Sequence, residues 1–282
     1  YGLVITASGD SGAHIWAPEL HKVNINDAID NSVDDEKVEQ QTDETHLIKQ
    51  PLLRLSGHSS VVISCDWLST VDQCVTASWD RTADIYDINT GELIVQLMGH
   101  DQELTDVEAH SSAPLIVTSS HDTTFRLWDF REAIHSVSVF QGHVDCVTSA
   151  TFLGTDKVVS GSDDRTVKVW DLKNMRSPLT SIYVEAPINK LGVSQQHNYI
   201  AIPLENRNVR LYDCNGNRIC RLPRNHHERM VTCVAFAAMN ASPCNAMQAC
   251  SPSLPYTGIQ LFTCGFDRKV CHWSINASDH KS

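Results

Sequence analysis

Short runs of alternating apolar and polar residues, separated by tight polar turns, fill most of this chain. The clearest is Val158–Asp171, VVSGSDDRTVKVWD. It predicts two short β-strands, VVSGS and TVKVWD, joined by the turn DDRT, because alternation at a period of two puts one row of side chains on the buried face of a sheet. We therefore predict an all-β protein.

The strand–turn–strand pattern recurs at a fixed period. Ser160, Asp164 and Trp170 stand four residues before, at, and six residues after the turn Asp. The same three positions recur at Thr6, Asp10 and Trp16; Thr76, Asp80 and Tyr86; Thr118, Asp122 and Trp128; Thr263, Asp267 and Trp273; and, in a degenerate copy, Ile202, Asn206 and Tyr212. Consecutive turn residues from Asp80 to Asn206 are 42 residues apart. A regular period of this length predicts a repeat protein.

These repeats resemble the WD-repeat β-propeller family, whose unit is a four-stranded blade of about 40–45 residues with Gly-His and Trp-Asp signatures. The signatures here are Gly57-His58, Gly99-His100 and Gly142-His143, and Trp-Asp or Tyr-Asp pairs ending at Asp87, Asp129, Asp171 and Asp213. The resemblance implies a WD-repeat propeller over residues 1–282, a single partial domain. About five and a half to six blades of a probable seven are expected to be present.

Two stretches interrupt the repeat. Residues 26–46 are acidic and free of aromatic side chains, so we predict a disordered insertion, because such a stretch cannot bury enough surface to offset its ordering entropy. We expect a solvated spacer there, and docking of a basic partner is the alternative. Residues 239–258 are rich in Pro, Ser, Ala and Asn and predict a second, loop insertion. Both insertions should lie on the bottom face, opposite the turn residues.

Composition narrows the function classes. The 282 residues are 41 % hydrophobic, which is enough for a buried core, and the formal net charge of −12 argues against nucleic-acid binding. No apolar run approaches the roughly 18 residues of a membrane span, and no signal-peptide pattern opens the chain. Cysteines scattered through the predicted strands favour a reducing, intracellular setting. The chain starts at Tyr1, in what should be the middle of a blade, so we expect a fragment of a longer protein. A targeting segment upstream of Tyr1 is compatible with this expectation.

Four groupings of His, hydroxyl and carboxylate resemble catalytic triads, in which an imidazole takes a hydroxyl proton while a carboxylate orients the ring. Repetition at one period, with an aromatic residue six positions after each Asp, instead fits the structural hydrogen-bond tetrad that the family resemblance implies. The implied tetrads are His58, Thr76, Asp80, Tyr86; His100, Thr118, Asp122, Trp128; His143, Ser160, Asp164, Trp170; and His227, Thr263, Asp267, Trp273. We therefore predict no enzyme and no catalytic residues.

Blade five departs from the pattern, because Ile202 replaces the hydroxyl residue and Asn206 replaces the Asp. We predict that it is the least rigid of the four regular blades. No cofactor or metal is expected either. Cys244 and Cys250 are spaced more widely than structural zinc ligands, and no Gly-rich phosphate loop opens a helix.

The residue before each turn Asp should project from one rim, the family's top face. Candidate protein-binding residues on this rim are Trp79, Val61, Ile63, His121, Met230 and Phe266. An exposed Trp beside two aliphatic residues is typical of a binding hot spot. The alternative is that these side chains pack against neighbouring loops.

We predict a non-enzymatic scaffold for protein–protein assembly that uses this top face. Resemblance to one particular member of the family implies an adaptor in the cytoplasm and nucleus, with phosphofurin acidic cluster sorting proteins as partners. That partner comes from the likeness alone, because propeller folds host many unrelated functions. The alternative is a substrate-recruitment module of a ubiquitin ligase or another enzyme complex.

Overall fold

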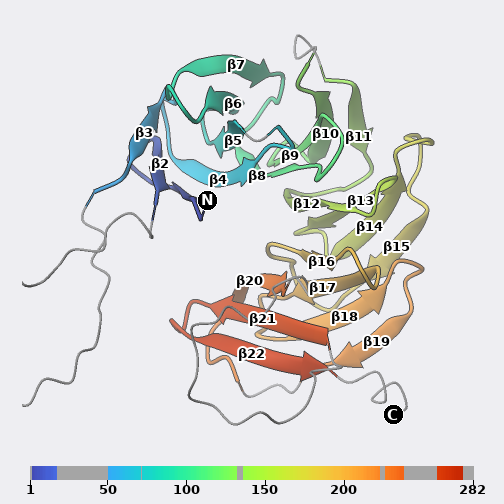
Figure 1. Ribbon diagram of the computed structural model, residues 1–282. Helices are drawn as coiled ribbons and strands as arrows, with labels where there is room; N and C mark the ends of the chain where they lie inside the picture. Colours follow the sequence, from blue (N-terminus) through green and yellow to red (C-terminus); the bar gives the residue numbers. More distant parts are fainter. Residues whose placement is uncertain are drawn as a thin grey trace, which may run out of the picture.

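The computed structural model describes residues 2–17, 50–70, 72–131, 136–222, 226–237 and 259–275. Within these residues the chain forms 22 strands in six antiparallel sheets and no helix. The sheets follow one another along an arc, and β4, β8, β12, β16 and β20 lie toward its centre (Figure 1). The predicted all-β propeller architecture is confirmed, while both predicted insertions fall outside the described residues.

Each sheet is a meander of consecutive strands, here called a blade. Blade one has β1 (Val4–Ala7), β2 (Gly12–Trp16) and β3 (Leu53–Ser56); blade two β4 (Val62–Trp67), β5 (Gln73–Ser78), β6 (Thr82–Asp87) and β7 (Leu93–Met98); blade three β8 (Leu104–Ala109), β9 (Leu115–Ser120), β10 (Thr124–Asp129) and β11 (Ser138–Gln141). Blade four has β12 (Val147–Leu153), β13 (Lys157–Ser162), β14 (Thr166–Asp171) and β15 (Thr180–Tyr183); blade five β16 (Gly192–Ser194), β17 (Tyr199–Pro203), β18 (Val209–Asp213) and β19 (Arg218–Arg221); blade six β20 (Val231–Phe236), β21 (Ile259–Gly265) and β22 (Val270–Ile275).

The turn Asp closes the hairpin between the second and third strands of a regular blade. In blade four, Asp164 Oδ1 accepts hydrogen bonds from the backbone N–H of Thr166 at 2.9 Å and from its hydroxyl at 2.6 Å. Arg165 between them adopts a φ of 64°, in the left-handed region that L-residues disfavour by roughly 1–2 kcal/mol. The Asp side chain offsets that cost, because it satisfies the backbone where the chain reverses.

The hydrophobic core lies between blades. One cluster combines Val75, Ile85 and Leu97 of blade two with Ile116 and Trp128 of blade three, and all five side chains are buried. The other clusters join neighbouring blades in the same way. A blade is therefore stabilised mainly by burying its faces against its neighbours.

The two faces of blade six differ for this reason. Phe262 and Val270 are 41 % and 72 % exposed, whereas Val117 and Phe125, at the same repeat positions of blade three, are fully buried against blade four. The opposite face of blade six carries Leu261, which is packed in the cluster shared with blade five. Only one face of the last described sheet is therefore covered by the described residues.

Polar side chains join four blades at the centre of the arc. The innermost strands of blades two, three and four each have a register shift directly before one residue: Ser64, Asp106 and Ser149. Such β-bulges change the direction in which a side chain points. Asp106 accepts hydrogen bonds from the hydroxyls of Ser64 and Ser149 at 2.8 and 2.9 Å, while Lys190, just before β16, reaches across to Asp106 at 2.7 Å and to Ser64 at 3.0 Å. We call these four residues the central network.

The charges of the central network support each other. Burial works to lower the pKa of Lys190, but the Asp106 carboxylate outweighs it and raises that pKa. Asp106 is buried, so its charge depends on the cation and the two hydroxyls. The network therefore fixes blades two to five around one buried carboxylate.

We expect Lys190→Met to lower the free energy of unfolding by about 1–2 kcal/mol, because the buried Asp106 loses a cation that is itself 44 % exposed and screened by water. Urea unfolding followed by tryptophan fluorescence measures the change. The double variant Lys190→Met, Asp106→Asn should regain part of the loss, since it removes the stranded charge. A single variant as stable as the parent would contradict this role.

Candidate functional site

The repeated tetrads place a His between a carboxylate and a hydroxyl in blades three and four. In blade three, His100 Nδ1 lies 2.7 Å from Asp122 Oδ2 and its Nε2 lies 2.9 Å from the Thr118 hydroxyl. The Trp128 indole N–H donates to the same hydroxyl oxygen at 2.8 Å. Blade four repeats this arrangement at 2.9, 2.8 and 2.9 Å with His143, Asp164, Ser160 and Trp170.

The same bonds recur in blade six and, in part, in blade one. His227 lies 3.1 Å from Asp267 and 2.9 Å from the Thr263 hydroxyl, which accepts the Trp273 indole N–H at 3.0 Å. In blade one, the Trp16 indole donates to Thr6 at 2.9 Å. The hydrogen-bond order is therefore the same wherever the Ser/Thr and Trp positions are both filled.

The pKa shifts of tetrad residues indicate which of their atoms carry protons. Burial would raise the pKa of Asp122, but the bonds from His100, the Thr124 hydroxyl and the Asp101 N–H lower it, and Asp164 shifts in the same direction. Burial lowers the pKa of His143. In blade four, the ionised Asp164 beside the neutral His143 makes Nδ1–H the donor to the carboxylate, so Nε2 accepts from the Ser160 hydroxyl.

This proton arrangement leaves the Ser160 hydroxyl fully engaged, because it donates to imidazole and accepts from indole. Thr76, Thr118 and Ser160 have no exposed surface. A nucleophile must meet its substrate beside an oxyanion site, which these buried oxygens do not. The geometry suits a structural role, in which each buried polar group satisfies the next.

Blade two differs from the expected tetrad at its aromatic member. His58 lies 2.9 Å from Asp80 and 2.8 Å from Thr76, but the Tyr86 hydroxyl donates to Asp84 at 3.2 Å and not to Thr76. The reason is the residue four positions after the turn Asp, which is Asp84 here and a basic residue in blades three to five. Asp84 provides an acceptor that the other blades lack at this position.

Asp84 gives His58 a second carboxylate. Asp84 is fully buried, its Oδ2 lies 3.6 Å from His58 Nδ1, and its Oδ1 has no hydrogen-bond partner among the described residues. Burial raises the pKa of Asp84. At Asp80 burial acts in the same direction, but the Thr82 hydroxyl, the Ser59 N–H and His58 lower the pKa. The two acids therefore differ, and Asp84 is the one that tends to hold a proton.

Blade five has an ion pair where the other blades have a His. Glu185 stands 21 residues before Asn206, the spacing that separates His143 from Asp164. The Arg210 guanidinium donates to Glu185, and the Asn206 amide donates to the same carboxylate at 3.4 Å. Arg210 is only 2 % exposed. Burial works to raise the pKa of Glu185, but the Arg210 guanidinium outweighs it and lowers that pKa. An ionic contact thus replaces the neutral tetrad.

The rim residues share one backbone contact. The residue before the turn position donates its N–H to the carbonyl of a residue at the start of the same blade: Trp79 to Val61, His121 to Glu103, Asp163 to Cys146, Glu205 to Pro187 and Phe266 to Met230, at 3.0–3.1 Å. These pairs therefore lie at the same end of their blades, and we call that end the top face.

The top face exposes two aromatic side chains. Trp79 is 48 % and Phe266 is 59 % exposed, and His121 is exposed as well. Val61, Ile63 and Met230 are half-buried. The structure thus brings Trp79 and Phe266 to solvent, while their aliphatic neighbours are partly covered.

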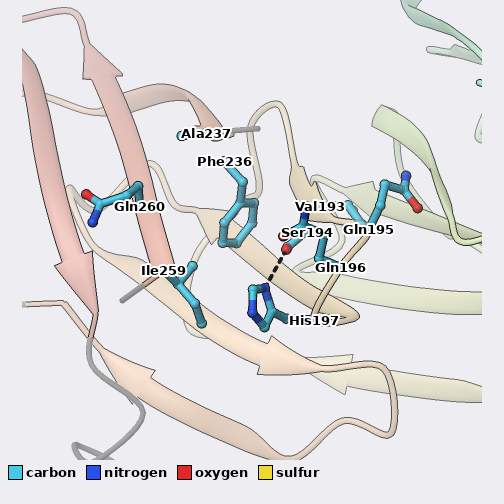
Figure 2. A pocket seen from close by; sticks show the side chains of 9 residues that line it. All are labelled: Val193, Ser194, Gln195, Gln196, His197, Phe236, Ala237, Ile259 and Gln260. Atoms are coloured by element: carbon cyan, nitrogen blue, oxygen red, sulfur yellow. Dashed lines mark hydrogen bonds between the residues drawn. The ribbon is translucent and has the colours of Figure 1, made fainter. Parts of the chain in front are cut away.

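A cleft of about 210 Å³ lies between blades five and six. It is lined by Val193, Ser194, Gln195, Gln196, His197, Phe236, Ala237, Ile259 and Gln260 (Figure 2). The Ser194 hydroxyl lies 3.3 Å from His197 Nδ1, and no carboxylate joins this pair in the lining, so a triad is not assembled. This cleft is mostly apolar with an amide rim.

Three segments of this chain match a known repeat family. Residues 49–87, 91–129 and 134–171 match the family described as WD domain, G-beta repeat. The chain is also similar to WD repeat-containing protein 37 of Xenopus tropicalis (48 % identical over 290 residues) and of Homo sapiens (49 % over 290 residues), in each case over 97 % of this chain. The chain belongs to the WD-repeat family.

The WD-repeat chain spans 56 % of the length of these relatives. WD repeats are typical of non-enzymatic scaffolds for protein interactions. No helix in the part that the structure describes is long and apolar enough to cross a membrane. Across the same residues, no three His, Cys, Asp or Glu side chains group as a metal site, and Cys244 and Cys250 lie outside the described ranges.

Two features of this WD-repeat chain escape the sequence analysis. Glu185 and Arg210 carry the blade-five contact, and Asp84 redirects Tyr86. The signal was present in both cases, since Glu185 occupies the His spacing and Asp84 breaks the run of basic residues four positions after the turn. Matching each blade position by position would have found them.

We expect Asp84→Asn to remove a pH dependence of stability. The folded pKa of Asp84 lies above its unfolded value, so its contribution is full below about pH 4 and is lost as pH rises through the folded pKa. The variant should therefore gain about 1–2 kcal/mol over the parent as pH rises to 7. Urea unfolding at pH 5, 6 and 7 measures this, and a pH-independent difference would contradict it.

Asp122→Asn is the matched control, with the opposite sign. The folded pKa of Asp122 is lowered, so its contribution is present above the unfolded pKa and is lost as pH falls below about 4. This variant should be less stable than the parent at pH 7, and the difference should shrink in acid. If the free energy of unfolding of the two variants depended on pH in the same way, Asp84 would not have the raised pKa that we assign to it.

We expect Glu185→Ala to lower the free energy of unfolding by about 2 kcal/mol, because it leaves the buried Arg210 guanidinium without its anion. The loss of stability is modest because Glu185 itself is 42 % exposed. Glu185→Gln keeps an acceptor and should cost less. Amide hydrogen exchange in β17 and β18 should quicken selectively in the Ala variant, and uniform exchange across blades would refute the local role.

Proposed function

We propose that this chain is a rigid, non-enzymatic platform that docks partner proteins on its top face. The observation that carries the proposal is the pair of exposed aromatic residues, Trp79 and Phe266, presented on hairpin turns at the same end of their blades. Exposed aromatic residues are enriched among binding hot spots.

The tetrads support this role because they hold the presenting turns. Trp79 directly precedes Asp80, whose carboxylate is fixed by His58, Thr82 and the Ser59 N–H. Phe266 directly precedes Asp267, which is fixed by His227 in the same way. A side chain held in place before binding loses less entropy on association, so more of its contact energy appears as affinity.

For the partner, we propose phosphofurin acidic cluster sorting proteins, and for the location the cytoplasm and nucleus. The support is the similarity to WD repeat-containing protein 37 over 97 % of this chain. The exposed Trp79 and Phe266 by themselves favour a protein partner.

Binding of the purified chain to a purified phosphofurin acidic cluster sorting protein tests the proposal. We expect Trp79→Ala, Phe266→Ala to weaken the affinity at least tenfold in titration calorimetry, as loss of two hot-spot side chains would. The control Leu93→Ala, Leu179→Ala removes two exposed apolar side chains, one at the start of β7 and one just before β15, and should change affinity less than twofold. Equal affinity for the parent and the top-face variant, with folding retained, would refute the top-face site.

Substrate recruitment for a ubiquitin ligase is the competing function. It would use the same exposed aromatic residues for substrate, together with a separate contact to ligase subunits. Direct binding of a ligase adaptor that survives the top-face variant would favour it over the platform.

A further inference from the structure

The top face changes chemical character from blade to blade. Blades two and six carry Trp79 with Val61 and Phe266 with Met230 on this face. Between them, blades three to five place carboxylates at or beside the equivalent positions: Glu103, Asp145, Asp163 and Glu205. We call these four residues the acidic arc.

Asp145, Asp163 and Glu205 of the acidic arc lie close enough to act on one another. Burial raises the pKa of Asp163, and the charges of Asp145 and Glu205 raise it further, with His121 acting in the opposite direction. Glu103, Asp145 and Glu205 are exposed and Asp163 is half-buried, so a partner can reach them. Their mutual repulsion favours a ligand that brings positive charge.

Nearby cations are partly engaged elsewhere. Lys190 is bound to Asp106 in the central network, and Lys269 pairs with Glu228 at 2.6 Å. Arg81 donates to the Asp101 backbone carbonyl at 3.4 Å, which ties the Trp79 turn to the loop that begins blade three. Arg165 and Arg207 follow the turn positions of blades four and five and remain the basic side chains that adjoin the arc.

We propose that the top face binds a basic peptide segment of a partner protein, with a bulky apolar residue packed on Trp79 and Lys or Arg side chains over the acidic arc. This inference rests on the proposed function and specifies the chemistry of its ligand. Trp79 on blade two and the acidic arc on blades three to five lie at the same end of consecutive blades, and the proposed ligand is one extended segment that reaches from one to the other.

The two subsites contribute differently. The apolar contact at Trp79 provides most of the affinity, because desolvated aromatic anchors dominate interface energies. The exposed carboxylates mainly speed association and fix the direction of the segment, and salt screens their effect within about 8–10 Å. Salt dependence therefore separates the two contributions.

Selection of random 12-residue peptides displayed on phage against the immobilised chain tests the proposal. We expect the enriched peptides to carry net positive charge and at least one Trp, Phe, Leu or Met. Enriched peptides that are neutral or acidic would overturn the basic class.

Affinities of an enriched peptide, labelled with fluorescein and measured by anisotropy, give the second readout. Asp163→Asn, Glu205→Gln should weaken binding about five- to twentyfold at 50 mM NaCl. The matched control Asp72→Asn, Glu92→Gln removes two exposed carboxylates at the opposite end of blade two and should change the Kd less than twofold. Raising NaCl to 300 mM should weaken the parent at least fivefold and the arc variant less than twofold.

The outcomes distinguish this inference from the proposed function. If Trp79→Ala, Phe266→Ala abolishes binding while the arc variant and salt do not change it, the top-face site stands and the basic ligand class is refuted. If neither variant weakens binding and both keep the parent's urea midpoint, the top-face site fails as well.

Discussion

The hydrogen bond between a buried imidazole and the turn carboxylate is the contact on which the blades depend. At His100 and His143 it joins the loop that enters a blade to the hairpin turn within that blade. It reinforces the one backbone hydrogen bond that also joins loop and turn, from His121 to Glu103 in blade three and from Asp163 to Cys146 in blade four. Loss of one member leaves the others buried and unpaired, which costs roughly 1–3 kcal/mol for each polar group.

Blades two and five meet the same geometric demand with other chemistry. In blade two, Asp84 accepts the Tyr86 hydroxyl and adds a second acid beside His58. In blade five, Glu185 and Arg210 form an ion pair, while Ile202 joins the apolar cluster shared with blade four. A buried polar position can thus be satisfied by a neutral chain of donors, by an ion pair, or by replacement with an apolar side chain.

The same contacts connect stability to recognition. Trp79 and Phe266 each precede a carboxylate that a His holds, so the exposed aromatic residues inherit the rigidity of the buried bonds. The central network adds a second constraint, since Asp106 and Lys190 join blades that are distant in the sequence. A docking surface formed by separate blades keeps its shape only if the angles between those blades are fixed.

The sequence by itself determined the repeat, the all-β fold and the blade boundaries, because strand alternation and turn chemistry are local and recur every 42 residues. It also placed the His, hydroxyl and carboxylate positions, since the family pattern ties them to fixed offsets. Tertiary structure decided the rest. The Tyr86 partner, the Glu185–Arg210 pair and the contact between Lys190 and Asp106 depend on which side chains approach across loops and blades, and no local period encodes such distances. Exposure of Trp79 at a turn and of Phe262 on a sheet face likewise depends on what covers each of them, a property of packing and not of the residue.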